Sequence, residues 1–251
     1  MRNAATVVIT MAGESRRFAR QGCLVPKYRL LVRGRPMIWW ALSGLTMYAK
    51  CGCRFVFVAR RDDDASELVQ EQCSALGISD VALMELSAPT DGQATSAFLA
   101  SDLAVDTEKP IIIFNIDTHL KPPCLGSPPE DCDGWIPCFP AGPGAWSFAR
   151  LTDFNRVAEV AEKVPISPWA TVGLYYFGSC SMFRSLYVEY SGRISGERYI
   201  APMYNLMIDR DCRVEASFLA KNDVIPLGTP EEVEQFDPDW RELNRHFLGE
   251  M

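Results

Sequence analysis

The chain has 251 residues, of which 48% are hydrophobic and 23% are charged, and its net charge is −7 at pH 7. These values are typical of a globular protein with one large domain and exclude a disordered or low-complexity chain. The acidic balance argues against a nucleic-acid partner, because no basic face can dominate by count. No apolar run is long enough to cross a bilayer, so we expect no membrane partner.

Nine cysteines occur without regular spacing, and no signal peptide is recognisable. This usage predicts reduced thiols and a cytoplasmic protein. Cys51 and Cys53 are too close in sequence for an ordinary zinc site, and the chain has only two histidines. We therefore interpret the cysteines as small apolar packing residues.

The first segment, residues 4–10, is an unbroken apolar run that predicts a strand buried on both faces. In the loop that follows, Gly13 permits a sharp turn and a close approach to a ligand. Arg16 and Arg17 come next, and Lys27 follows after Pro26. Backbone N–H groups, guanidinium groups and an ammonium are what a triphosphate site needs. The alternative is an ordinary surface loop with solvated arginines.

Alternating strand and helix patterns continue along the chain. Strands are expected at residues 28–32, 55–59, 81–86, 110–116, 134–139, 147–151, 157–161 and 214–219, and helices at 37–50, 65–75, 93–103, 179–190 and 202–210. Three adjacent aspartates, at residues 62–64, precede the second helix. They suggest either a metal site or a cap that interacts with the helix dipole, and we favour the cap.

Two polar positions in this pattern point to ligands. Gly92 precedes a helix whose first turn has only small and polar residues, and such an N-terminus accepts an anion or a base edge. Asp117 ends the most apolar strand, where open α/β sheets bind their ligands, although it could also cap the next turn. His119 lies beside it, and we expect His119 in a loop.

Met-Ala-Gly-x-x-x-Arg-Phe at residues 11–18, followed by Pro-Lys at 26–27, resembles the signature loop of nucleotidyltransferases that make nucleotide sugars and related activated head groups. The resemblance implies that Arg17 and Lys27 act on the triphosphate and that Asp117 holds Mg²⁺. It places the nucleotide against Ala12, Gly13, Glu14, Ser15, Arg16, Gly92, Gln93 and Thr95. The chain departs from the signature at Ser15, which replaces a glycine, and at Arg16, which replaces a serine or threonine.

The second half of the chain is similar to the acceptor half of the same family. The resemblance implies that Lys163 contacts the phosphate of the acceptor and that Glu162, Gly173, Glu197 and Asn205 bind the rest of it. Gly-Thr-Pro-Glu-Glu at residues 228–232 resembles the family's closing segment. The second metal ligand of many members falls here at Pro226, and Asp223 is the candidate substitute.

The resemblance covers residues 4–235. It implies a three-layer, Rossmann-like α/β fold with a mixed sheet, of the GT-A-like type, in a single domain at residues 1–236. An amphipathic helical tail at 237–251 would pack on that domain or on a partner chain, which leaves a homo-oligomer open. The implied enzyme moves a nucleoside monophosphate from a nucleoside triphosphate to a sugar 1-phosphate or a small phospho-compound, for nucleotide-sugar or surface-polysaccharide synthesis.

Two other functions stay open from the sequence. One is a glycosyltransferase that uses a nucleotide sugar on a related fold, although the Asp-x-Asp spacing of many such enzymes is absent. The other is a catalytically silent relative that binds a nucleotide without turning it over. The residues at 14–16 and Pro226 keep this second alternative open.

Overall fold

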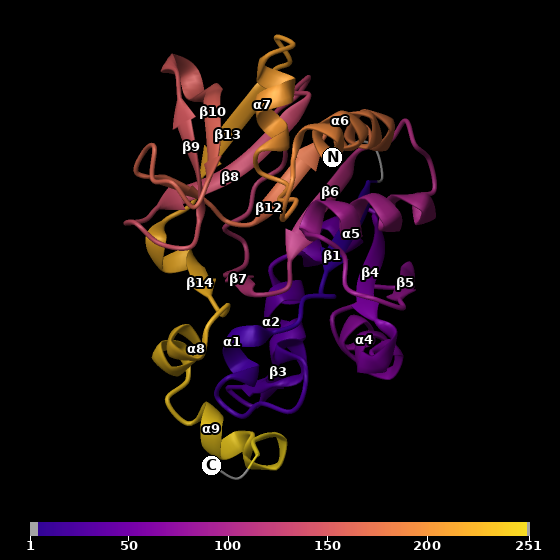
Figure 1. Ribbon diagram of the computed structural model, residues 1–251, viewed down its shortest axis with the longest axis vertical. Helices are drawn as coiled ribbons and strands as arrows, with labels where there is room; N and C mark the ends of the chain where they lie inside the picture. The colour runs from indigo at the N-terminus through magenta and orange to yellow at the C-terminus, as the bar shows by residue number, and fades with distance from the viewer. Residues whose placement is uncertain (1–4, 250–251) are drawn as a thin grey trace.

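The structure is a computed structural model that describes residues 5–249, apart from the side chain of Asp153. The first residue of the predicted strand 4–10 and the last two of the predicted tail lie outside the described residues. Within the described part, ten strands form one mixed sheet (Figure 1). In spatial order they are β10 (Val157–Glu162), β9 (Ser147–Leu151), β11 (Trp169–Thr171), β8 (Gly134–Pro140), β12 (Leu174–Phe177), β6 (Ile111–Asn115), β1 (Thr6–Thr10), β4 (Arg54–Arg60) and β5 (Val81–Leu86), with β13 (Val214–Phe218) paired to β8.

The direction of pairing divides this sheet into two halves. Strands β6, β1, β4 and β5 run parallel, as helical crossovers require. β12 joins β6 in the antiparallel sense and leads to the hairpin β9–β10, which lies at the upper left of Figure 1. Two small ribbons lie outside the main sheet. They are β2 (Leu31–Val32) with β3 (Arg35–Pro36), and β7 (Thr118–Leu120) with β14 (Val224–Pro226).

Helices cover both faces of the sheet, because its central strands are apolar on both sides. One core joins α2 and α4 to side chains such as Ile9, Phe57 and Phe114. A second core joins α5, α6 and α7 to the alternate side chains, among them Val8 and Ile113. The predicted three-layer, Rossmann-like α/β fold is therefore confirmed. The helices are α1 (Arg16–Ala19), α2 (Met37–Ser43), α3 (Thr46–Lys50), α4 (Ser66–Ala75), α5 (Gln93–Ala100), α6 (Cys180–Arg193), α7 (Met203–Ile208), α8 (Pro230–Phe236) and α9 (Trp240–Leu243).

Several predicted elements are shorter or broken in the structure. The expected helix at residues 37–50 divides at Gly44, where a methyl group would lie 2.5 Å from the carbonyl oxygen of Leu120. This close approach of β7 leaves no room for a side chain at residue 44, while the backbone departs from helical geometry at Leu45. The helix predicted at 93–103 is α-helical only to Ala100 and continues as the 3₁₀ turn Ser101–Leu103. The strand predicted at 28–32 is reduced to β2, after a 3₁₀ turn at Lys27–Arg29.

The prediction that the aspartates at 62–64 cap a helix is wrong. They lie in a 3₁₀ turn, Arg61–Asp63, and α4 begins only at Ser66 without a side-chain cap. Asp63 is buried and instead accepts hydrogen bonds from Arg60, at 2.7 Å, and from the hydroxyl of Tyr28, at 3.1 Å. A buried carboxylate needs such partners, and these come from the fold rather than from the local helix.

The C-terminal segment is not the long amphipathic helix that the sequence predicts. It consists of the single-turn helix α9 and a 3₁₀ turn at Arg245–Phe247. It does pack on the body of the domain, beside α1 and β3 in Figure 1. Trp240 is buried against Phe18, and the amide of Asn244 pairs with both backbone groups of Leu31 at 2.7 Å.

All nine cysteines are free thiols, and every one except Cys51 is buried or half-buried. This burial agrees with their interpretation as packing residues. Within residues 5–249, no helix has both the length and the apolarity needed to cross a membrane.

Candidate functional site

A cleft of about 940 Å³ opens at the carboxyl ends of β1 and β6. Open α/β sheets bind their ligands at this edge. The lining comes from segments that are far apart in sequence, including the loop after β1, the start of α5, the end of β6, the end of β10 and the loop before α7. The predicted site residues that line it are Ala12, Gly13, Glu14, Ser15, Arg16, Arg17, Lys27, Gly92, Gln93, Asp117, Glu162, Lys163, Gly173 and Glu197.

The loop after β1 is held in place by Ser15. This residue has a left-handed backbone with φ of 51°, and its Oγ accepts a hydrogen bond from the backbone N–H of Lys27 at 3.1 Å. The bond joins the two ends of the loop, so the serine at the glycine position contributes to the loop's structure. Arg16 donates to Glu14 at 2.6 Å and is 77% exposed, so its charge lies at the mouth of the cleft.

Lys27 and Asp117 form an ion pair on the floor of this half of the cleft. The ammonium lies 2.6 Å from Asp117 Oδ2, and the two side chains are only 18% and 27% exposed. Burial by itself would raise the pKa of Asp117, but the nearby charge and hydrogen bond of Lys27 outweigh it, so the pKa is lowered. Asp117 is therefore ionised at neutral pH and the pair carries opposite charges.

Three polar side chains at the ends of β1, β6 and α5 form a small network beside this pair. The amide of Gln93 donates to Thr10 Oγ1 at 3.0 Å and to Asn115 Oδ1. Gly173 makes room for Asn115, because a methyl group at Gly173, where φ is +78°, would lie 2.6 Å from Asn115 Nδ2. Gly173 therefore has a packing reason to be glycine, as well as a place on the wall of the cleft.

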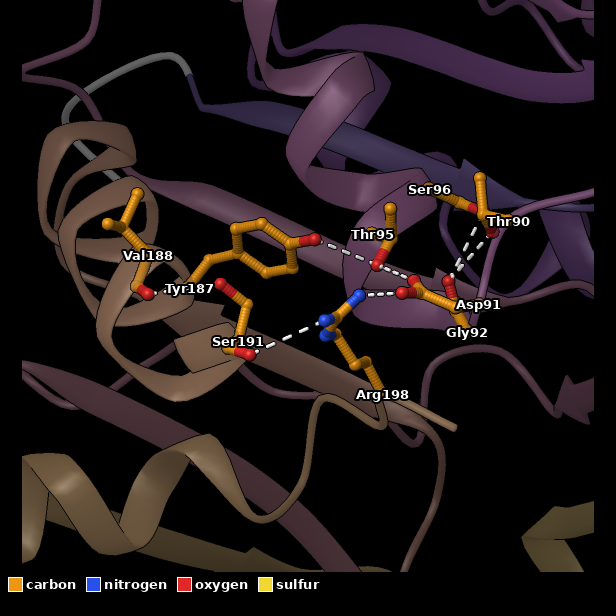
Figure 2. A network of polar contacts seen from close by, with 9 residues as sticks. All are labelled: Thr90, Asp91, Gly92, Thr95, Ser96, Tyr187, Val188, Ser191 and Arg198. Atoms are coloured by element: carbon orange, nitrogen blue, oxygen red, sulfur yellow. Dashed lines mark hydrogen bonds and ion pairs between the residues drawn. The ribbon is translucent and has the colours of Figure 1, made fainter. Parts of the chain in front are cut away.

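The N-terminus of α5 is joined to the loop before α7, as Figure 2 shows. The backbone N–H of Arg198 donates to Asp91 at 2.8 Å, and the N–H of Ala94 donates to the carbonyl of Arg198 at 2.9 Å. The guanidinium of Arg198 pairs with the carboxylate of Asp91. A methyl group at Gly92, where φ is +150°, would collide with the backbone of Arg198. We call this set of contacts the Asp91–Arg198 clasp.

The clasp changes the interpretation of the α5 N-terminus. We expected free N–H groups there, ready for an anion, but the N–H of Ala94 already has a partner in Arg198. Thr95 is not part of the cleft lining; it bonds to Asp91 and, at 2.8 Å, to the hydroxyl of Tyr187 (Figure 2). The helix start therefore connects the two halves of the cleft, with Gly92 and Gln93 on its wall.

Lys163 is the centre of a polar chain at the other end of the cleft. Its Nζ donates to the hydroxyl of Tyr199 at 2.5 Å, and that hydroxyl donates to Glu197. Burial would lower the pKa of Lys163, but its bond to Tyr199 and the carboxylates of Glu162 and Glu197 outweigh this and raise it. Its backbone φ is +59°, a conformation that a non-glycine residue rarely adopts.

Glu162 lies on the inner wall of this end. It accepts a hydrogen bond from Ser147, and its Oε1 is 3.9 Å from the ammonium of Lys163. Burial raises the pKa of Glu162 and outweighs the lowering by Ser147 and Lys163, while the charge of Glu197 raises it further. Ser147, Tyr175 and Tyr199 were not predicted from the sequence, although they line the cleft beside predicted residues.

Two of the remaining predicted residues are not brought to the cleft lining. The amide of Asn205 pairs with both backbone groups of Val160, at 2.9 and 2.8 Å, and so covers the edge strand β10. Asp223 lies in the turn before β14. Because Pro226 is paired with Thr118 and Val224 with Leu120, the antiparallel register carries Asp223 away from Asp117. The prediction of His119 in a loop is wrong: it is buried in β7 and bonds to the carbonyl of Trp40 at 2.8 Å.

A second carboxylate near Asp117 escaped the sequence analysis. Glu232 Oε2 accepts a hydrogen bond from the backbone N–H of Gly228 at 2.9 Å, and Gly228 lines the cleft. The pKa of Glu232 is raised. Burial and the charge of Asp117 raise it and outweigh the lowering by the hydrogen bond from Gly228. Glu232 belongs to the Gly-Thr-Pro-Glu-Glu segment, for which the resemblance placed a metal ligand at Pro226 and assigned no role to Glu232.

No protein-family model and no curated protein sequence matches the chain. Among solved structures, it is similar to the nucleoside-diphosphate-sugar pyrophosphorylase from Vibrio cholerae RC9, with 33% identity and a TM-score of 0.85 over 92% of this chain and 99% of that one. It also has the fold of the inositol-1-phosphate CTP transferase from T. maritima, with 16% identity and a TM-score of 0.73 over 96% and 98% of the two chains. The identity to the first of these, over nearly the whole length of both chains, shows that this protein belongs to the nucleotidyltransferase family.

Proposed function

We propose that the protein is an enzyme that moves a nucleoside monophosphate from a nucleoside triphosphate to a phosphorylated small molecule and releases pyrophosphate. The observation that carries the proposal is the placement of Lys27, Asp117 and Lys163 on one cleft. The two ammonium groups come from opposite halves of the sheet. A reaction that joins two phosphates needs cations at both ends and exact positioning of the reacting atoms.

In the proposed reaction, an oxygen of the acceptor phosphate attacks the α-phosphorus of the triphosphate in line. A new P–O bond forms while the bond to the pyrophosphate oxygen breaks, and pyrophosphate leaves with that electron pair. A phosphate monoester is largely deprotonated at neutral pH, since its second pKa is about 6, so the attack needs no protein base. The protein has to hold and neutralise the two anions.

We assign Lys27 and Arg17 to the triphosphate, together with backbone N–H groups of the loop at Ala12, Gly13, Glu14, Ser15 and Arg16. The carboxamide of Gln93 and the backbone at Gly92 would face the nucleoside. Lys163 would bind the acceptor phosphate from the opposite end of the cleft. Its left-handed backbone turns it out of the edge strand towards the cleft, which supports this role.

The donor set of the cleft fits a divalent cation that relies on phosphate oxygens, for which we propose Mg²⁺. Within residues 5–249 there is no group of three or more His, Cys, Asp or Glu that could hold a metal by itself. Mg²⁺ commonly takes one or two protein carboxylates and completes its shell with phosphates and water. Asp117 would supply such a carboxylate, and the bound ion would neutralise charge on the phosphates.

Among phosphorylated acceptors, a sugar 1-phosphate fits the second half of the cleft best. Glu162 and Glu197 offer carboxylate oxygens, which accept hydrogen bonds from hydroxyl groups. Tyr199 and Gly173 lie on the same walls. The Vibrio cholerae relative is named as acting on nucleoside-diphosphate sugars, which supports this choice. The product would be a nucleotide sugar for polysaccharide synthesis.

Pyrophosphate release is the direct test. The four common nucleoside triphosphates are incubated with Mg²⁺ and, one at a time, with sugar 1-phosphates or small phosphates such as phosphocholine. We expect pyrophosphate from one preferred pair, together with a product of the combined mass. Consumption of a nucleotide sugar without pyrophosphate would instead indicate a glycosyltransferase. Binding of a triphosphate without turnover of any acceptor would indicate a silent relative.

A further inference from the structure

Two carboxylates face the same small space above Gly228. A methyl group at this glycine would lie 3.1 Å from Asp117 Oδ2 and 3.4 Å from Glu232 Oε2. The two oxygens are therefore no farther apart than the sum of these distances, 6.5 Å. Two oxygen ligands of one Mg²⁺, at 2.0–2.1 Å each, lie at most about 4.2 Å apart, so the two carboxylates would have to approach by no more than about 2.3 Å for one ion to touch both.

We propose that Glu232 supplies the second protein carboxylate towards the divalent cation, opposite Asp117. The inference rests on the proposed function, which includes that cation. Glu232 reaches the space above Gly228 from the first turn of α8, nine residues after Asp223.

The other acidic residues of this region are less suitable. Asp223 lies at the far end of the β7–β14 ribbon, where its carbonyl accepts a hydrogen bond from Lys121. Glu231 is exposed and accepts a hydrogen bond from Gln21 at 3.0 Å. Of these three acidic residues, Glu232 is the one whose carboxylate faces Asp117 at Gly228, and the N–H of Gly228 donates to its Oε2.

Glu232 also supports the start of α8, and this role must be separated from metal binding. Its N–H donates to Thr229 Oγ1 at 3.1 Å, and its Oε2 accepts from Gly228. A carboxylate has about four acceptor positions, so the bond from Gly228 leaves room for an ion. Glu232→Gln keeps an oxygen for Gly228 and removes the charge, which makes it the informative substitution.

The test measures Mn²⁺ binding to the full chain by electron paramagnetic resonance, with Mn²⁺ alone as the probe and without turnover. We expect Glu232→Gln and Asp117→Asn each to weaken Mn²⁺ binding about tenfold or more. The controls Glu231→Gln and Asp223→Asn should bind Mn²⁺ as the wild type does. Melting curves without metal should agree for the wild type and Glu232→Gln. If Glu232→Gln is unstable, Gly228→Ala tests the same point, because its methyl group fills the space between the carboxylates.

Mn²⁺ binding that is unchanged in both Glu232→Gln and Gly228→Ala overturns the inference, as does a wild-type chain that binds no Mn²⁺. If the wild type releases pyrophosphate but Mn²⁺ binding is unchanged in both variants, the role of Glu232 is overturned and the proposed function is not. Absence of pyrophosphate release with every substrate pair overturns the proposed function, and is a separate result from the Mn²⁺ titration.

Discussion

The two ends of the cleft are built differently, and the difference suggests a division of labour. At the end that we assign to the nucleotide, Lys27 and Asp117 form a close, shielded pair in which the lysine is only 18% exposed. At the end that we assign to the acceptor, Lys163 is 47% exposed and bonds to Tyr199 in a loop. Shielded charges interact more strongly than solvated ones. We infer that the first end carries the chemistry and that the second selects the acceptor.

Replacement of Lys27 is the strongest test of this division. Lys27→Ala should lower kcat by about 10²–10³, because preorganised charges at a reacting phosphate contribute this much to catalysis. It should change the KM of the acceptor much less. Steady-state measurement of pyrophosphate release, with each substrate varied in turn, separates the two parameters.

Arg16→Ala is the matched control for Lys27→Ala. Arg16 belongs to the same loop, but it is 77% exposed and paired with Glu14, so screening reduces its contribution. We expect less than about a fivefold change in kcat, in keeping with the small value of exposed ion pairs. Equal losses in the two variants would contradict the idea that the shielded pair dominates.

Replacement of Lys163 probes the acceptor end. Lys163→Ala should lower kcat/KM for the acceptor by about 10- to 100-fold, the loss expected for a hydrogen bond of about 1.5–3 kcal/mol to a charged group. Alanine and lysine are equally strained at a backbone φ of +59°. Any loss of activity in Lys163→Ala therefore reflects the missing ammonium and not a change in backbone strain. The exposed Lys221, which is not part of the cleft lining, is the control. A loss confined to the nucleotide's KM would place Lys163 at the wrong end.

The clasp between the two ends can be broken at Gly92. Gly92→Ala should destabilise the protein by about 1–3 kcal/mol, because the new methyl group meets the backbone of Arg198. It should also raise the KM of the acceptor, since the displaced loop carries Glu197 and Tyr199. Urea denaturation and acceptor kinetics measure the two effects.

Gly196→Ala separates strain from collision in that experiment. Gly196 also has a positive φ, of +126°, but a methyl group there would meet no atom within 4 Å. Gly196→Ala should therefore destabilise the protein only through the strain of a positive φ. We expect Gly92→Ala to lower the free energy of unfolding more than Gly196→Ala does. A larger effect at Gly196 would show that the loop's own conformation matters more than its attachment to α5.

The parts of the molecule that the sequence predicts well are those decided by local pattern. The apolar runs that became β1, β4 and β6 are buried on both faces, so burial and periodicity agree. Asp117 follows from the same logic, since it lies two residues beyond the end of β6, the most apolar strand. The order of strands β8 to β13 depends on long-range pairing, and no local pattern specifies it.

The missed features depend on contacts between distant segments. Leu120 approaches Gly44 so closely that no side chain fits there, and Asp63 accepts a hydrogen bond from Tyr28, which is 35 residues away. Asn205 matched the resemblance but bonds to the edge of β10. Glu232 was overlooked because its nearness to Asp117 exists only after the chain has folded.

The smallest effect that we predict concerns Glu162, whose pKa is raised by burial. The folded state binds this proton more tightly than the unfolded state, in which the pKa is about 4.3, so stability decreases as pH rises through the interval between the two values. Glu162→Gln lacks this titration. We therefore expect the free energy of unfolding of Glu162→Gln, minus that of the wild type, to be larger at pH 7 than at pH 4. Urea denaturation of both proteins at both pH values measures this difference. In a Lys163→Ala background the increase should be larger, because the ammonium that lowers the pKa of Glu162 is gone. The opposite trend would mean that Glu162 is held as a stabilised anion, and this end of the cleft would then be as firmly organised around charge as the nucleotide end.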